Sequence, residues 1–347
     1  MRAVVAIPPL PRMTGGIAVL YQLAESIREC GHDVVLAGAA EAPGLAARAA
    51  RGFPLWPWEA VTGGQRDTAL RPEDVFIAAE GWPNMLAPAL AAGSRILVYA
   101  QNWAYMFSAL PPGVSWHALP VSFLAVSQPV AHFVEDLAKL PLAGIVRPAL
   151  EPALFRPAQP DVSRTVRVAW MPRKNRALAE QIRRIAAAMA GRDGDARLEW
   201  VEIRGLSREE VARTLGGCHI FLATGFPEGF ALPPLEAMAS GCLVVGFSGF
   251  GGWDYMRQAE GGRYAPPLSP RAVPWGGNGF FASDGDVLEA AALLVRAVEL
   301  VRENGSRAAA IREEALRTAA AYSPEAQKEA VRALWEGLAA GRGAGAL

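Results

Sequence analysis

Short apolar runs alternate with longer segments of helical period along the first half of the chain. The apolar runs have the length of buried strands, and they lie at residues 2–9, 32–38, 74–80, 95–101 and 123–127. A glycine turn at Gly15 and Gly16 separates the first run from an amphipathic segment over 17–31. This order of strand, turn, helix and strand is typical of a βαβ unit in a parallel sheet. We therefore predict a doubly wound α/β domain over residues 1–150.

A second series of the same kind follows a stretch that is rich in proline. Residues 147–164 lack periodicity, which is typical of a linker between domains. The strand-like runs beyond it lie at residues 166–171, 197–203, 219–225, 242–247 and 277–283. Helical segments separate these runs, so we predict a second doubly wound domain over 151–322. The predicted fold class is α/β, with two Rossmann-like domains.

One more helix is predicted within residues 323–347. Pro324 stands where this helix begins, because proline is favoured in a first turn, and Gly341 is placed to end it. Another helix start is marked by Ser207 and Glu210, whose spacing is that of a capping box.

The composition limits the function. The 347 residues carry a formal net charge of zero, whereas a nucleic-acid-binding protein would have a basic excess. No apolar run approaches the length of a membrane span and no signal peptide is recognisable, so we expect a cytoplasmic protein. The cysteines form no metal-binding or disulfide pattern and lie at Cys30, Cys218 and Cys242. We expect neither a metal ion nor a cofactor.

The segment most informative about chemistry is 225–246, which reads GFPEGFALPPLEAMASGCLVVG. Its Pro-Pro pair and the LEAMAS sequence predict a helix that begins beside Glu228, with Glu236 in the first turn. A helix N-terminus offers free N–H groups and a positive dipole end to a phosphate. A carboxylate repels phosphate, but it accepts two hydrogen bonds from a sugar diol. Both features together predict a site for a sugar nucleotide.

A cationic pair, Arg173 and Lys174, directly follows the strand-like run at 166–171. The carboxyl ends of strands face the crevice where α/β proteins bind ligands. Cleavage of a sugar–diphosphate bond builds negative charge on the departing oxygen, which fixed cations stabilise without a metal. A solvated basic turn is the alternative interpretation.

Two further candidates lie in the first domain. The turn at Gly15 and Gly16 lacks the G-x-G-x-x-G spacing of dinucleotide sites, so NAD binding is not predicted. Gln101 and Asn102 lie at the end of the run at 95–101. Either side chain would donate a hydrogen bond to a sugar hydroxyl or cap the end of the strand.

Glu228, the Gly229-Phe230 pair, the P-LEAMA run and the small-G-x-VV ending together resemble the donor signature of the family 4 retaining glycosyltransferases. The resemblance implies the GT-B architecture, in which two Rossmann-like domains face each other across a cleft. It also implies that a terminal helix crosses back to the first domain. The implied activity is retaining, metal-independent transfer of a sugar from a nucleotide-sugar donor to an acceptor, as in polysaccharide biosynthesis.

The resemblance also gives each candidate residue a role. Glu236 would bind the ribose hydroxyls of the donor, and Glu228 would lie beside the transferred sugar. The cations Arg173 and Lys174 would stabilise the leaving diphosphate. Backbone N–H groups would bind phosphate or sugar, and they belong to Phe230, Ala231 and Leu232. The turn at Gly15 and Gly16 would approach the donor phosphate and the acceptor.

One departure from the family concerns a histidine that many relatives carry near the position of Gln101. This sequence has none there, and the nearest histidine, His117, lies downstream. Gln101 or Asn102 is therefore the expected replacement on the side of the acceptor and the sugar.

The acceptor stays open and ranges from a glycan to a lipid-linked or small molecule. Its expected contacts lie on loops of the first domain, at Arg12, Met13, Trp82, Trp103 and Tyr105. An apolar cluster of Phe53, Trp56 and Trp58 is expected on a loop, where it would contact an acceptor or a membrane, although packing is the safer interpretation. Because the charges of the first half nearly balance, we expect membrane association to be weak.

Other functions are compatible with the same architecture. A sugar-nucleotide epimerase and a sugar phosphorylase are the enzymatic alternatives. A GT-B-like protein that binds a ligand without catalysis is a further alternative. The one feature that favours it is the missing histidine. A glycosidase pair formed by the two glutamates is disfavoured, because a hydrolase needs no phosphate-binding helix start.

Overall fold

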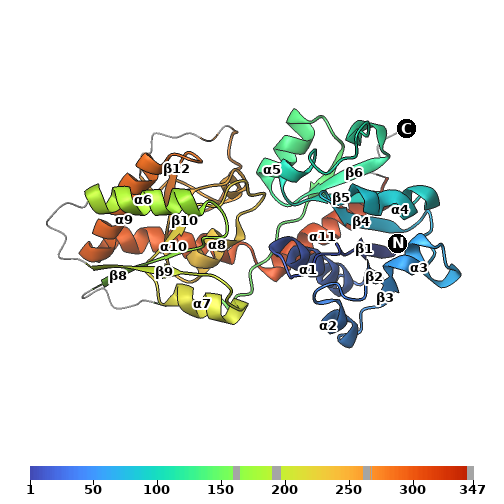
Figure 1. Cartoon of the computed structure of the whole chain (residues 1–347), viewed down its shortest axis with the longest axis horizontal. Coiled ribbons are helices and arrows are strands. Elements are labelled where there is room, and N and C mark those ends of the chain that lie inside the picture. The colour runs from blue at the N-terminus through green and yellow to red at the C-terminus, as the bar shows by residue number, and fades with distance from the viewer. Residues whose placement is uncertain (159–164, 190–196, 261–265, 267, 342–347) are drawn as a thin grey trace. The chain divides into compact units, whose positions relative to one another are not determined.

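The computed structural model describes residues 1–158, 165–189, 197–260, 266 and 268–341 (Figure 1). Contacts between residues divide the chain into two compact units. Unit 1 comprises Met1–Ala149 together with Pro324–Leu347, and unit 2 comprises Leu150–Ser323. The predicted linker, residues 147–164, includes this boundary, and its part from 159 to 164 lies outside the described residues.

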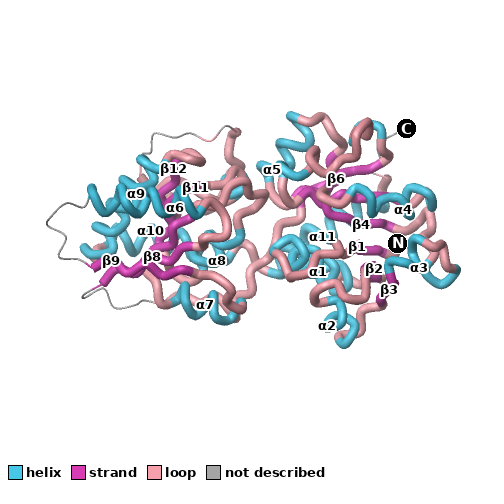
Figure 2. Tube along the Cα trace, in the orientation of Figure 1, coloured by secondary structure: helices cyan, strands magenta, loops and turns pink. Residues whose placement is uncertain are grey.

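Unit 1 is built on a parallel sheet with the strand order β3-β2-β1-β4-β5-β6-β7. The strands are β1 (Ala3–Ala6), β2 (Val34–Gly38), β3 (Leu55–Pro57), β4 (Val75–Ala79), β5 (Arg95–Ala100), β6 (Val121–Ala125) and β7 (Leu142–Ile145). The α-helices are α1 (Gly15–Glu29), α2 (Leu45–Ala50), α3 (Trp58–Thr62), α4 (Ala87–Ala92), α5 (Gln128–His132) and α11 (Pro324–Ala339). Helices flank the strands, as the cyan and magenta tubes of Figure 2 show. Strands β1, β2 and β6 are therefore buried throughout, which explains their continuous apolar sequences.

The sequence pattern misses two strands of unit 1, β3 and β7. The loop expected around Phe53, Trp56 and Trp58 is wrong, because Trp56 lies in β3 and Trp58 begins α3. With 3 residues, β3 is too short to show a period. Phe53 and Trp56 are buried beneath the guanidinium groups of Arg28 and Arg2, which lie 3.7 and 4.6 Å from the respective ring centroids. These two rings therefore pack within unit 1.

Unit 2 contains a second parallel sheet with the order β12-β11-β10-β8-β9. The strands are β8 (Thr165–Trp170), β9 (Arg197–Glu202), β10 (Ile220–Ala223), β11 (Leu243–Phe247) and β12 (Gly279–Ala282). The α-helices are α6 (Arg176–Met189), α7 (Arg208–Gly216), α8 (Leu232–Ala239), α9 (Val287–Glu303) and α10 (Ser306–Ala320). The two parallel sheets with their helices confirm the predicted α/β class, and the predicted capping box of Ser207 and Glu210 is present at the start of α7.

Helix α11 belongs to unit 1, although it follows unit 2 in the sequence. It packs against α1 and β7. The buried side chain of Gln327 accepts a hydrogen bond from the Ser26 hydroxyl (2.6 Å) and donates to the carbonyl oxygen of Arg147 (2.7 Å) and to Oε1 of Gln22 (3.1 Å). Of the helices that the structure describes, none combines the length and apolarity needed to cross a bilayer.

Replacing Gln327 by leucine should destabilise unit 1, because the Ser26 hydroxyl and the Arg147 carbonyl would lose a buried partner. We expect the free energy of unfolding to fall by about 2 kcal/mol, measured by urea unfolding. Gln65→Leu, at an exposed position, is the control and should change it by less than about 0.5 kcal/mol. If the two variants were equally stable, the buried network would contribute nothing to the attachment of α11.

Candidate functional site

Two loops that follow neighbouring strands form the base of the candidate site in unit 2. Lys174 lies in the loop after β8 and Gly225 in the loop after β10, and these strands pair in parallel, so their carboxyl ends meet at one sheet edge. The side-chain amide of Asn175 ties the loops together. Its Nδ2 donates to the carbonyl oxygens of Thr224 (2.9 Å) and Phe226 (3.1 Å).

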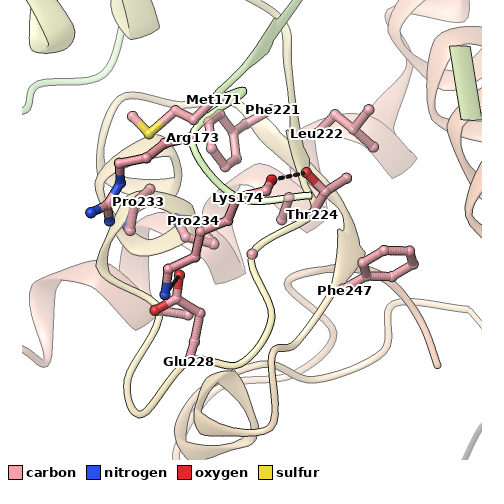
Figure 3. A pocket seen from close by; sticks show the side chains of 13 residues that line it. Met171, Arg173, Lys174, Phe221, Leu222, Thr224, Glu228, Pro233, Pro234 and Phe247 are labelled. Atoms are coloured by element: carbon pink, nitrogen blue, oxygen red, sulfur yellow. Dashed lines mark hydrogen bonds and ion pairs between the residues drawn. The ribbon is translucent and has the colours of Figure 1, made fainter. Parts of the chain in front are cut away.

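A pocket opens at this edge and lies entirely within unit 2 (Figure 3). It holds about 450 Å³ of space not occupied by protein atoms, part of it open to solvent. Its lining comprises Met171, Arg173, Lys174, Phe221, Leu222, Ala223, Thr224, Gly225, Glu228, Ala231, Pro233, Pro234 and Phe247. Within the described part of the chain, no three His, Cys, Asp or Glu side chains gather as a metal site would require.

The pocket brings a carboxylate and two cations together. The Lys174 ammonium lies 2.9 Å from Oε1 of Glu228 and also donates to the carbonyl oxygen of Pro227 at 2.9 Å. Arg173 is exposed, and its guanidinium lies apart from this pair in Figure 3. Among the residues that the structure describes, it has no hydrogen-bonding or ionic partner. One cation therefore neutralises Glu228, while the other remains available to an anion.

A loop rich in glycine holds Glu228 in place. The Glu228 N–H donates to the carbonyl of Gly249 (2.9 Å), and the Gly251 N–H donates to the carbonyl of Glu228 (3.0 Å). A Cβ atom at Gly251 would overlap the carbonyl carbon of Gly229, so this approach requires glycine. The partly buried carboxyl of Asp284 in turn accepts the N–H of Gly249 (2.8 Å), and desolvation raises the pKa of this carboxyl to about 6. Neither these glycines nor Asp284 is among the predicted site residues.

The start of α8 forms one wall of the pocket. Its N-cap residue, Ala231, is left-handed, with φ 62° and ψ 62°. Pro233 and Pro234 have no N–H, so Ala231 and Leu232 carry the backbone donors of this helix start. In the described residues, these two N–H groups have no acceptor. Ala231 lines the pocket, whereas Phe230 and Leu232 do not.

The predicted place of Glu236 in the first turn of its helix is wrong. Because α8 begins at Leu232, Glu236 lies in the second turn, and it does not line the pocket. Its side chain is 14% exposed, and burial raises its pKa to about 7 against the opposing effect of Arg208, whose Nη2 lies 3.7 Å from Oε1. Arg208 also pairs with Glu151. Glu236 therefore shares a cationic neighbour with Glu151, and its pKa lies near neutrality.

The predicted residues of unit 1 lie together at the carboxyl end of β5. A Cβ atom at Gly16 would lie 2.6 Å from Oε1 of Gln101, so the Gln101 side chain packs directly over this glycine. Nε2 of Gln101 is buried without a partner in the described part of the chain. Asn102 accepts the N–H of Ala104 (3.1 Å) as the N-cap of a 3₁₀ helix, Trp103–Tyr105. Capping therefore accounts for Asn102, whereas Gln101 keeps an unused donor next to Gly15 and Gly16.

Glu80, which is not among the predicted site residues, supports the backbone at Gln101 and Asn102. It is 3% exposed, follows β4, and accepts the backbone N–H groups of Gln101 (3.0 Å) and Asn102 (2.9 Å). Burial raises the pKa of this carboxyl to about 7. Its signal in the sequence is the acid that ends the apolar run at 74–80.

Comparisons with known proteins agree on the fold. No family model matches the chain. An α-1,6-glucosyltransferase of Actinobacillus pleuropneumoniae serotype 7 is 49% identical over 53 residues, which are 15% of this chain and 16% of that protein. The match thus spans about a sixth of the length of the curated relative.

Two solved structures resemble nearly the whole chain. Sucrose-phosphate synthase from Thermosynechococcus elongatus has a TM-score of 0.68 and 13% identity, covering 98% of this chain and 100% of that one. HepE from Anabaena, solved in complex with UDP and glucose, has a TM-score of 0.63 and 13% identity, covering 97% and 98%. These similarities confirm the predicted GT-B type of fold, while membership of family 4 stays a prediction.

The raised pKa of Glu236 predicts how stability depends on pH. Folded Glu236 holds its proton up to about pH 7, whereas the ordinary pKa of a glutamate side chain is about 4.5, so its contribution to the stability of unit 2 falls as the pH rises between these values. Glu236→Gln should therefore gain roughly 2 to 3 kcal/mol in free energy of unfolding relative to the wild type between pH 5 and pH 8.

Urea unfolding of both proteins at pH 5 and pH 8 measures this difference. Glu313→Gln, at an exposed position on α10, is the control, and its difference from the wild type should be independent of pH. A pH-independent difference for Glu236→Gln as well would contradict the raised pKa.

Proposed function

We propose that this protein is a retaining, metal-independent glycosyltransferase that moves a sugar from a nucleotide-sugar donor to an acceptor. The observation that carries the proposal is the convergence of Lys174, Glu228 and the start of α8 on one pocket. The glucosyltransferase relative and the UDP and glucose named with HepE make UDP-glucose the first donor to test.

The diphosphate of the donor would lie at the start of α8. There the N–H groups of Ala231 and Leu232, with the positive end of the helix dipole, would bind its oxygens. Arg173 and Lys174 would stabilise the charge that develops on the departing oxygen. Arg173 is suited to hold two phosphate oxygens through its planar guanidinium, and Lys174 acts as a point charge. In this proposal, these groups perform the work that other transferases leave to a metal ion.

Glu228 would lie beside the transferred sugar. As the bond between the anomeric carbon and the diphosphate oxygen breaks, its carboxylate would stabilise the positive charge on that carbon. The acceptor hydroxyl then forms the new bond on the same face, and its proton passes to the departing diphosphate oxygen. This sequence of events retains the anomeric configuration, and it requires Lys174 to be shared between Glu228 and the diphosphate.

The remaining predicted residues would bind the ribose of the donor and the acceptor or the transferred sugar. Glu236 would accept hydrogen bonds from the ribose hydroxyls as a carboxylate, with Arg208 favouring its ionised form. Gly15 and Gly16 lie at the start of α1 and not in a turn before it. On unit 1, these two glycines and the unused amide donor of Gln101 would bind the acceptor or the sugar. The acceptor itself would be a glycan, a lipid-linked sugar or a small molecule.

Calorimetry with UDP is expected to show binding that EDTA does not change. Glu236→Ala should weaken this binding by about tenfold or more, because two hydrogen bonds to the ribose are lost. Glu313→Ala, at an exposed glutamate, is the control and should bind UDP as the wild type does. GDP, dTDP and ADP, measured in parallel, test the choice of base. Loss of binding in EDTA would contradict the metal-independent mechanism.

Turnover is expected to depend on Glu228 and Arg173. Glu228→Gln and Arg173→Ala should each reduce the release of UDP from UDP-glucose by about 100-fold or more in the presence of an acceptor. Arg302→Ala, an exposed arginine on α9, is the control for loss of charge. Full activity in either site variant would remove that residue from the mechanism, and release that needs free phosphate in place of an acceptor would indicate a phosphorylase.

A further inference from the structure

The donor wall of the pocket depends on a backbone conformation that alanine does not favour. Ala231 is left-handed, a backbone region that is unfavourable for a residue with a Cβ atom. Such a conformation persists only when surrounding groups hold it. At Ala231, it turns the chain into α8 and orients the N–H groups of Ala231 and Leu232.

Tyr255 is the residue that holds Ala231. Its side chain is fully buried, and its hydroxyl donates a hydrogen bond of 2.6 Å to the carbonyl oxygen of Ala231. Its ring also packs against Phe230, with 5.6 Å between the centroids. Tyr255 is not among the pocket-lining residues, so it would act on a ligand only through the 230–232 backbone.

The position of Tyr255 is itself fixed from two sides. Its carbonyl oxygen accepts hydrogen bonds from the indole of Trp275 (2.9 Å) and the side-chain amide of Asn278 (2.8 Å). The ring of Tyr322 packs against it at 5.8 Å and against Phe230 at 5.3 Å. The Tyr255 hydroxyl therefore has little freedom to move away from Ala231.

A buried polar network anchors Tyr322 in turn. Its hydroxyl donates to Oδ2 of Asp254 (2.7 Å) and accepts from Nη2 of Arg271 (3.0 Å). Asp254 is fully buried and directly precedes Tyr255. Because Gly251 of the same loop binds the Glu228 carbonyl, a single segment, 249–255, holds both the carboxylate and the helix start of the pocket.

We propose that Tyr255 is a positioning residue of the donor site, whose hydroxyl keeps the N–H groups of Ala231 and Leu232 directed at the donor diphosphate. The inference rests on the proposed function. A tyrosine that served only to fill the core would stabilise the fold without affecting ligands. The two roles predict different effects of removing the Tyr255 hydroxyl, because only a positioning role predicts weaker binding of a diphosphate.

The test compares two tyrosines that make the same hydrogen bond in different units. Tyr99 is also fully buried, and its hydroxyl donates to the carbonyl oxygen of Val146 at 2.6 Å in unit 1. Tyr255→Phe and Tyr99→Phe each remove one buried hydroxyl bonded to a backbone carbonyl, so their melting temperatures should fall similarly. Only Tyr255→Phe should weaken the binding of UDP in calorimetry, by about tenfold.

A second ligand separates the diphosphate from the rest of the nucleotide. Uridine lacks the phosphates, so its affinity, measured by ligand-observed NMR, should be the same in Tyr255→Phe and the wild type. Unchanged UDP affinity in Tyr255→Phe, or an equal loss for UDP and uridine, would overturn the positioning role. Tyr322→Phe provides a second variant, in which the ring remains and a smaller, UDP-specific loss is expected.

Failure of the proposed function would give a different result in these binding measurements. If the wild type bound no nucleotide at all, the donor assignment would fail for every variant alike. The crystal structure of Tyr255→Phe then decides the remaining claim. Departure of Ala231 from its left-handed conformation would support the positioning role, and an unchanged Ala231 would overturn it.

Discussion

The close backbone contact between residues 228–229 and 249–251 is the constraint on which the unit 2 pocket depends. Glu228 bonds to both Gly249 and Gly251, and a side chain at Gly251 would force the segments apart. With the contact in place, the Glu228 carboxylate reaches Lys174, which comes from a different strand end. The pocket is thus lined by the loops after β8 and β10, while the loop after β11 holds Glu228, and the parallel pairing of these strands brings the loops to one edge.

Local sequence patterns predicted the parts of the molecule that are buried on both sides. Strands such as β1 and β11 read as apolar runs because helices cover both faces of a parallel sheet. The pattern failed where an element is short, as in β3. It also misplaced the first residue of α8, so Glu236 lies in the second turn of this helix and not in the first. The loop position of Glu228 followed from the prolines that start the next helix.

Residues that act on other parts of the chain through space escaped the sequence analysis. Glu80 binds the backbone at Gln101 and Asn102 because β4 pairs with β5, a neighbour relation that no local pattern contains. Asp284 and Tyr255 are similar, since each holds a loop that is distant in sequence. Glu80 is buried, Glu236 and Asp284 are partly buried, and desolvation raises their pKa values to about 7, 7 and 6, respectively. The unit 2 pocket and the residues around Gln101 in unit 1 are therefore both close to carboxyls whose charge changes near neutral pH.

The place of α11 sets an order of events during synthesis. Unit 2 is one continuous segment, so all of it has been made before α11 is translated. Until then, the face of α1 that carries Ser26 lacks the helix that covers it, although every strand of the unit 1 sheet has already been made. The buried bond between Ser26 and Gln327 therefore forms only after the whole of unit 2 has been synthesised.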